Sequence, residues 1–225
     1  MDPRRVDYTG DGLAEDQLLD TPYAQVRAWV DDAVRRSESE SDVFEPLAAA
    51  VATVDADGRP NVRTVLMRFL DERGPGFVTA VTSAKGQELA VNPHIAAGLT
   101  WPAMYRAVRF RGRAVALDRA EVEEYWRSRP WASRISAWAS DQSRPIGSRA
   151  DLEAAYRQRA EEFPDHGSVE DVPVPDFWGG FRIVCDEIEL WAGRRNRLHD
   201  RLVYTRTGEG DLDDATSWGL SRRQP

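Results

Sequence analysis

The segment RNRLHDR, residues 195–201, places arginine or histidine at every second position: Arg195, Arg197, His199 and Arg201. Side chains two residues apart share one face of a β-strand, so an extended conformation predicts a single face made of Arg197, His199 and Arg201. Two roles fit such a face. It is either a solvated edge strand whose charges prevent aggregation, or the wall of a pocket that binds phosphate or carboxylate through arginine.

Further cationic and hydroxyl groups lie in several short segments elsewhere. RTVLMR, residues 63–68, puts Arg63 and Arg68 on a predicted strand, and TSAK, residues 82–85, puts the only lysine, Lys85, near a predicted helix start. Free backbone N–H groups and the helix dipole favour phosphate at such a start. Two more segments contribute Tyr125, Arg129, Ser133, Gln142 and Ser143. Together these groups supply donors for more than one phosphate.

The overall composition narrows the class of ligand. The chain has 225 residues and a formal net charge of -8 at pH 7, so a nucleic-acid partner is not expected and the local cations predict a small anionic ligand. The only cysteine, Cys185, allows no internal disulfide, and the three histidines have no metal-ligand spacing, so no metal site is expected. Without a signal peptide or a run of ~20 apolar residues, a cytoplasmic protein with no membrane partner is expected.

Strands separated by helices are expected to position these groups. Residues 20–36 predict an amphipathic helix that begins at Thr21 and Pro22. Residues 48–81 predict three strands and residues 94–118 two more. Shorter helices are expected at 83–92, 118–129 and 148–163, followed by a loop at 164–176 and a hairpin of strands 179–191 and 197–206. The pattern favours a mainly β fold with helices (α+β), a largely antiparallel barrel.

Four longer motifs occur in order along the chain: SRPxxSxIxAWxSxQS, FWGGFR, RLHDR and the terminal WxxxRxxP. Together they resemble the pyridoxamine 5'-phosphate oxidase family, over nearly the whole chain from about Arg5 to Pro225. The resemblance implies a homodimeric split β-barrel that binds FMN at the subunit interface. It also implies oxidation of pyridoxine or pyridoxamine 5'-phosphate to pyridoxal 5'-phosphate, with O2 as electron acceptor and H2O2 as product.

The resemblance also assigns residues. It implies FMN contacts at Arg63, Val65, Leu66, Arg68, Thr79, Lys85, Gln142, Ser143, Trp191 and Arg201. It implies substrate contacts at Arg68, Tyr125, Arg129, Ser133, Arg197 and His199. Of these, Arg197 and His199 are the expected catalytic residues: Arg197 would clamp the substrate over the cofactor, and His199 would orient it or carry a proton. Residues 1–20, with Arg5 and Tyr8, match a segment that can cover the site in the family, and the resemblance implies that residues 21–225 form a single FMN-binding split-barrel domain.

Four positions differ from the family pattern: Arg68, Val78, Ala84 and Ala107. The family has lysine, tyrosine, arginine and glutamine there, the last of which bonds the flavin ring. A lost charge-assisted hydrogen bond costs roughly 1.5–3 kcal/mol, which Arg106 or Arg109 could offset. The changes keep two alternatives open: an oxidase of secondary metabolism resembling the phenazine-biosynthesis oxidase, which acts on a reduced aromatic carboxylate, and a non-enzymatic binder of flavin or pyridoxal phosphate.

Overall fold

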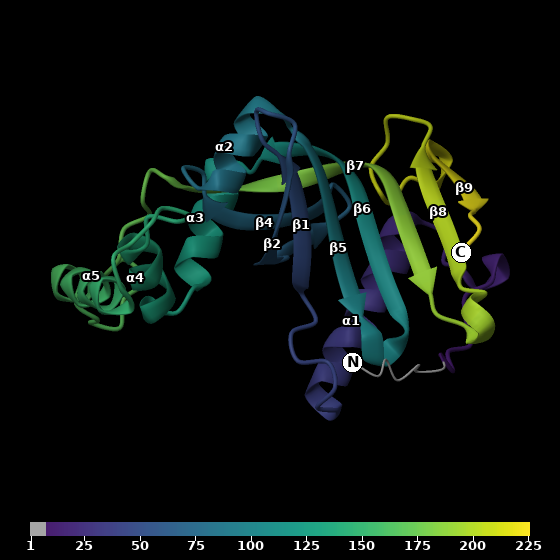
Figure 1. Ribbon diagram of the computed structural model, residues 1–225, viewed down its shortest axis with the longest axis horizontal. Coiled ribbons are helices and arrows are strands. Elements are labelled where there is room, and N and C mark those ends of the chain that lie inside the picture. The colour runs from purple at the N-terminus through teal and green to yellow at the C-terminus, as the bar shows by residue number, and fades with distance from the viewer. Residues whose placement is uncertain (1–7) are drawn as a thin grey trace.

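The computed structural model describes residues 8–225, and within them the strands form one nine-stranded sheet (Figure 1). Every pairing is antiparallel. The order is β2-β1-β5-β6-β7-β4-β3, with β8 also beside β7 and β9 beside β8. The sheet curls into a split barrel, which confirms the predicted antiparallel fold. The strands are β1 Ala48–Val54, β2 Pro60–Leu66, β3 Phe69–Asp71, β4 Gly74–Ala80, β5 His94–Trp101, β6 Arg106–Ala116, β7 Trp178–Ala192, β8 Asp200–Arg206 and β9 Trp218–Arg222.

The long strand β7 joins the two ends of the molecule. One edge pairs with β6, and the other pairs first with β4, from Trp178, and then with β8, up to Ala192. A β-bulge shifts the β6–β7 register between Arg111 and Gly112, and a side chain at Gly112 would collide with the Val184 carbonyl. Such a bulge bends a strand, so β7 contributes to two separate surfaces.

The helix α1 covers one face of the sheet. It runs from Pro22 to Ser39, and the Thr21 hydroxyl accepts the Ala24 N–H at 3.1 Å, as its predicted cap requires. The predicted apolar stripe is buried against the strands, with Val26 and Trp29 in the main core. Each such side chain contributes about 1.5–3 kcal/mol on burial. The other helices are α2 Ala84–Val91, α3 Arg119–Ser128, α4 Trp131–Ala139 and α5 Arg149–Glu162, with short 3-10 turns at Glu15–Gln17, Pro102–Met104, Arg195–Arg197 and Ala215–Ser217.

A second, smaller core lies under α3, α4 and α5. Its centre is Trp126, whose ring lies 5.4 Å from that of Trp178 and whose indole N–H donates to the Val172 carbonyl at 2.9 Å. Figure 1 shows α4 and α5 at one end of the molecule and β8 and β9 at the other. Among the described residues no helix is long and apolar enough to span a membrane.

Two differences from the predicted elements bear on the site. Residues 48–81 contain four strands instead of three, because the chain bends at Met67 and Arg68, where β2 leaves its partner β1 and β3 begins to pair with β4. Helix α4 was not predicted. It begins after Pro130 and buries Arg134 and Ile135, and it lies between the segments that carry Arg129 and Gln142.

Candidate functional site

A pocket of about 200 Å³ lies between β2, β4, α2 and α3, and we call it the anion pocket. Eight of its ten lining residues are among those that the resemblance to the family predicts for the site. Three lining side chains are cationic, and none of the ten is Asp or Glu, so the pocket suits an anion. The ten are Thr64, Val65, Leu66, Arg68, Val78, Thr79, Lys85, Tyr125, Arg129 and Gln142.

Lys85 is buried at the base of the anion pocket. Its Nζ donates to the Thr79 Oγ1 at 2.9 Å and to the Gln142 Oε1 at 2.8 Å, so neutral oxygens satisfy it and no carboxylate neutralises it directly. Burial, and next the positive charge of Arg63, lower the pKa of Lys85 to about 8, against the opposing effect of Glu88. The negative charge of a bound phosphate would stabilise the protonated form of Lys85 and raise its pKa again.

Arg129 also lines the anion pocket. Its guanidinium lies 4.8 Å from the ring centroid of Trp178 and 5.9 Å from that of Tyr125, which holds it against aromatic faces. One N–H donates to the Ser133 carbonyl at 2.9 Å, while Nε is buried and has no hydrogen-bond partner within residues 8–225. Burial lowers the pKa of Arg129. A half-buried arginine whose Nε–H has no partner among the described residues is suited to bind an oxyanion.

Three predicted residues lie beside the anion pocket without lining it. Arg63 pairs with Glu88 at 2.8 Å, so its guanidinium is occupied and it acts on Lys85 through its charge. The backbone of Ser133 makes two hydrogen bonds: its carbonyl accepts from Arg129, and its N–H donates to the Pro130 carbonyl at 3.0 Å. Ser143 is exposed and has a φ of 75°, in the left-handed region, where it ends the turn after Gln142.

The other predicted residues lie on the β7–β8 hairpin, away from the anion pocket: Trp191, Arg197, His199 and Arg201. The expectation that Arg197, His199 and Arg201 share a strand face is wrong. Strand β8 begins only at Asp200, and residues 195–197 form a 3-10 turn in which Asn196 and Arg197 have φ values of 58° and 60°. Reversing the chain over so few residues requires left-handed positions, which asparagine tolerates.

His199 is held in one orientation at this turn. Its Nδ1 accepts the Arg194 N–H at 3.0 Å, so the proton of the neutral ring is on Nε2, which is free to donate. Its ring packs 4.8 Å from that of Trp191 and 5.1 Å from that of Tyr8. Tyr8 therefore brings the N-terminal segment onto the hairpin, whereas Arg5, the other residue predicted in that segment, lies outside the described residues.

Two predicted cofactor residues, Trp191 and Arg201, lie opposite each other across β7 and β8, and Ala107 faces Trp191 from β6. These three positions thus form a row across three strands. Arg201 donates through Nε and Nη2 to Glu189 at 3.0 and 2.8 Å. Cavities of about 390 and 420 Å³ lie over this surface, which we call the β6–β8 face; the first reaches Trp191 and the second reaches Arg201.

Some residues of these surfaces were not predicted from the sequence. Glu189 is buried two residues before Trp191, and Tyr105 packs on Tyr8 with a left-handed φ of 52°. The alternation of Glu189 with Trp191 in the predicted strand was the available signal, because both must face the same side. The φ of Tyr105 has no counterpart in the sequence, since a bulky residue rarely adopts it.

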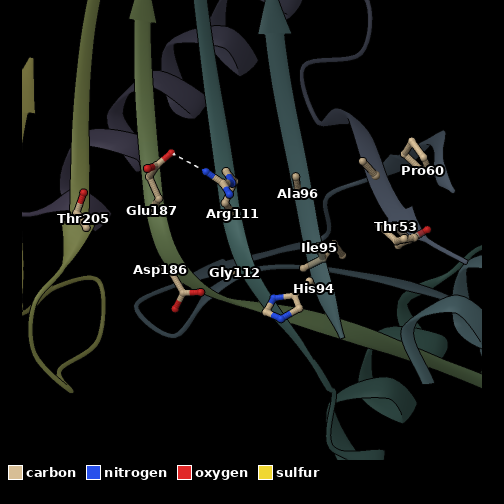
Figure 2. Close-up of a pocket in the computed structure, with 12 residues that line it drawn as sticks. Thr53, Pro60, His94, Ile95, Ala96, Arg111, Gly112, Asp186, Glu187 and Thr205 are labelled. Carbon is tan, nitrogen blue, oxygen red and sulfur yellow. Dashed lines mark ion pairs between the residues drawn. The ribbon is translucent and has the colours of Figure 1, made fainter. Parts of the chain in front are cut away.

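A further cavity, of about 430 Å³, lies at the β-bulge (Figure 2). Figure 2 shows the ion pair of Arg111 and Glu187, with Asp186 and His94 lining the same cavity. The two charged groups of the pair lie 3.6 Å apart. None of the described residues that line it belongs to the predicted site. Its charges are mixed and its arginine is paired, so it lacks the cationic character of the anion pocket.

Two family models match the chain. The model described as pyridoxamine 5'-phosphate oxidase matches residues 31–162, and the model described as the pyridoxine 5'-phosphate oxidase C-terminal dimerisation region matches residues 178–225. The first carries the anion pocket and the second carries the β7–β8 hairpin.

Individual proteins agree with these matches. The pyridoxine/pyridoxamine 5'-phosphate oxidase of Kineococcus radiotolerans is 46% identical over 223 residues, which is 99% of this chain and 97% of that protein. The enzyme of the same description from Crocosphaera subtropica is 40% identical, with 98% and 97% covered. The crystal structure of PhzG from Burkholderia lata, in complex with tetrahydrophenazine-1-carboxylic acid, superposes with a TM-score of 0.82 at 29% identity, covering 97% of this chain and 100% of that one. The chain therefore belongs to the pyridoxamine 5'-phosphate oxidase family of flavin-dependent oxidases.

Proposed function

We propose that this protein oxidises pyridoxine or pyridoxamine 5'-phosphate to pyridoxal 5'-phosphate with FMN as cofactor. The observation that carries the proposal is the anion pocket, where Arg68, Lys85 and Arg129 converge without a lining carboxylate. Both FMN and this substrate carry a phosphate. The alcohol and O2 give the aldehyde and H2O2; the amine requires water in addition and releases ammonia.

The residues around Lys85 fit the FMN phosphate. Lys85 is a buried cation whose hydrogen bonds go only to neutral oxygens, those of Thr79, Gln142 and, at 3.4 Å, Ser83. It lies in the first turn of α2, where backbone N–H groups favour an anion. When bound, FMN supplies the two-electron redox chemistry. The protein residues hold the phosphate and fix the position of the ring.

The residues around Arg129 fit the substrate phosphate. Its buried Nε has no partner, and Tyr125 and Trp178 hold the guanidinium in place. Arg68 is exposed and lines the same pocket as Arg129 and Lys85, so we propose that it contacts both ligands. Its planar guanidinium can bind two oxygens of one phosphate bidentately, whereas the family's lysine offers a compact point charge.

The anion pocket alone is too small for both ligands. Its volume is about 200 Å³, whereas pockets for one drug-sized ligand are ~300–1,000 Å³. The missing wall corresponds to the β6–β8 face, where Trp191 and Arg201 lie. We propose that a second copy brings this face to the anion pocket, so that a homodimer holds FMN at its interface; the match to a dimerisation region supports this arrangement.

In this arrangement Arg197 and His199 act on substrate from the second copy. Arg197 is exposed and held in the left-handed region, a strained conformation that is common at functional sites. It would clamp the substrate over the flavin. The Nε2–H of His199 would donate to a substrate oxygen and so orient the carbon that is oxidised.

Oxygen uptake by FMN-loaded protein tests the proposal. Uptake is measured with pyridoxine 5'-phosphate and with pyridoxamine 5'-phosphate, while aldehyde formation is followed in the same sample. We expect saturable rates and one aldehyde per O2 consumed. Protein that holds FMN but forms no aldehyde from either compound would contradict the proposed substrate.

The structural match to PhzG favours one second candidate. That structure holds tetrahydrophenazine-1-carboxylic acid, and in this chain Val78, Ala84 and Ala107 replace larger polar residues of the vitamin oxidases. A carboxylate could bind Arg129 in place of phosphate. Turnover of a reduced aromatic carboxylate, with no turnover of either vitamin phosphate, would establish this function. Binding of FMN without turnover of any of them would indicate a non-enzymatic binder.

A further inference from the structure

The β6–β8 face lacks a donor where the flavin ring is expected. In the row Ala107–Trp191–Arg201, position 107 carries only a methyl group, although the family has a glutamine there that bonds the ring. Trp191 and Arg201 are unchanged. If FMN binds as proposed, another side chain on this face has to supply the missing hydrogen bond, or the site binds the ring more weakly.

Two arginines of β6 flank this gap, and the structure separates them. Arg106 is directed at α1: its guanidinium pairs with Asp32 at 2.8 Å and lies 4.9 Å from the ring centroid of Trp29. Arg109 is two residues beyond Ala107, about 7 Å along the strand and on the same face. Its side chain is 51% exposed, against 33% for Arg106, which lines the same cavity at Ala107 and Trp191, so Arg109 is the more accessible of the two to a ligand.

Arg109 also connects the two halves of the face. It lines both the cavity of about 390 Å³ that reaches Ala107 and Trp191 and the cavity of about 420 Å³ that reaches Arg201. Among the described residues that line these two cavities, it is the only one common to both. A flat ligand that lies across Ala107 and Trp191 and extends toward Arg201 borders both cavities, so Arg109 lies beside it.

The charges around Arg109 favour an electron-rich ligand. Arg109 and Arg201 both pair with one buried carboxylate, that of Glu189, so the cluster has one excess positive charge. Burial, and next the positive charge of Arg201, lower the pKa of Arg109. An acceptor placed between the two guanidinium groups would relieve this repulsion.

We infer that Arg109 is a flavin-binding residue, donating to the carbonyl-bearing edge of the FMN ring in place of the amide missing at position 107. The inference rests on the proposed function, because it takes FMN as the ligand of this face. Reduction adds negative charge to that edge of the ring, so a fixed cation there binds the reduced cofactor more tightly than the oxidised one and raises its reduction potential.

Flavin titration and potentiometry test the inference without an activity assay. FMN is titrated into apo-protein by fluorescence quenching for the parent, Arg109→Met and the control Arg113→Met, which alters an exposed arginine further along the same face. We expect Kd to rise about tenfold for R109M and to stay within about twofold for R113M. We also expect the reduction potential of FMN bound to R109M to become more negative, because the variant loses more affinity for reduced than for oxidised FMN. Each factor of ten between these two losses of affinity lowers the potential by about 30 mV.

A rescue variant separates a lost donor from a damaged fold. In Ala107→Gln/Arg109→Met the amide returns, and we expect at least threefold of the lost affinity to return with it. Circular dichroism checks that each variant is folded. If R109M is not folded, Arg109→Lys is tested in its place. This variant keeps the charge and loses the planar fork, so we expect Kd for FMN to rise about threefold. A variant with the parent's Kd and potential overturns the role of Arg109. A parent that binds no FMN overturns the proposed function instead.

Discussion

The anion pocket and the β6–β8 face hold their cations in different ways. In the pocket, Lys85 is held by neutral hydroxyl and amide oxygens and Arg129 by aromatic rings. On the face each arginine has a glutamate: Arg109 and Arg201 share Glu189, and Arg223 pairs with Glu187 at 2.5 Å. Desolvated cations without counter-charges gain most from binding an anion. The pocket therefore suits a phosphate, as the proposed function requires, and the face suits a ring that carries little charge until it is reduced.

Lys85→Met is expected to have the largest effect on this comparison. It removes the buried cation from the anion pocket. The phosphate then loses charge-assisted hydrogen bonds that contribute ~1.5–3 kcal/mol each. We expect FMN affinity to fall at least about 100-fold. Gln87→Met, on the exposed side of α2, is the matched control and should bind FMN like the parent. Equal titration curves for all three proteins would remove Lys85 from the cofactor site.

Arg129→Ala is expected to act on substrate and leave the cofactor in place. Loss of its contacts should raise KM for pyridoxine 5'-phosphate about 10- to 100-fold, while Kd for FMN changes less than about threefold. Steady-state kinetics at saturating FMN measures the first and fluorescence titration the second. Arg127→Ala, on the exposed side of α3, is the control. A larger change in FMN affinity than in KM would mean that Arg129 binds the cofactor phosphate instead.

The pH dependence of FMN binding sharpens the comparison further. The pKa of Lys85 is lowered to about 8, and phosphate binds its protonated form. Below pH 8 the lysine is charged and Kd should be constant; above pH 8 it loses its proton, and Kd should rise, approaching tenfold per pH unit. Fluorescence titration between pH 6.5 and 9.5 covers the transition. In Lys85→Arg the cation does not titrate, so its Kd should be independent of pH over this range.

Arg222→Ala should have the smallest effect, and it tests the N-terminal segment. Arg222 bonds both Glu15 oxygens at 2.8 Å and contacts Asp200 at 2.5 Å, tying residues 13–15 to the strand that follows His199. The exposed pair with Glu15 contributes ~0–1 kcal/mol, and the buried Asp200 keeps Arg194 and the Leu13 N–H as partners. Thermal stability should therefore change little, while amide exchange in residues 8–20 becomes faster. Arg223→Ala, similarly exposed, is the control. Unchanged exchange in the Arg222 variant would show that other contacts hold the segment.

The sequence predicted regular elements better than it predicted turns. Helix α1 carried a cap, a proline at its start and an apolar stripe, and all three have the expected roles. Helix α4 was missed because its signal is short: Trp131, Ile135 and Trp138 recur at helical spacing after Pro130. The RNRLHDR segment alternates like a strand, but left-handed backbone at Asn196 and Arg197 overrides that pattern. Alternation of residue types predicts which side chains share a face if the segment is extended, but it does not predict whether the backbone turns there.

Resemblance to a family predicts the site residues, whereas their types and spacing alone leave their roles open. The structure brings together the group around Lys85 and Arg129, which segments far apart in the sequence could not reveal. It leaves Trp191 and Arg201 on a different surface. That separation is invisible in one sequence, because residues that complete a site from a second copy carry no mark that distinguishes them from residues of the same copy.

Subunit mixing tests most directly the claim that the two surfaces meet between copies. Lys85→Met breaks the anion pocket and Arg201→Ala breaks the β6–β8 face; the two variants are unfolded together, refolded and loaded with FMN. Random pairing gives half heterodimers, each with one intact site, so about a quarter of the sites should regain parental FMN affinity and turnover. Each variant refolded alone should regain none. A mixture no better than the separate variants would contradict the account, because both surfaces would then serve a site within a single chain.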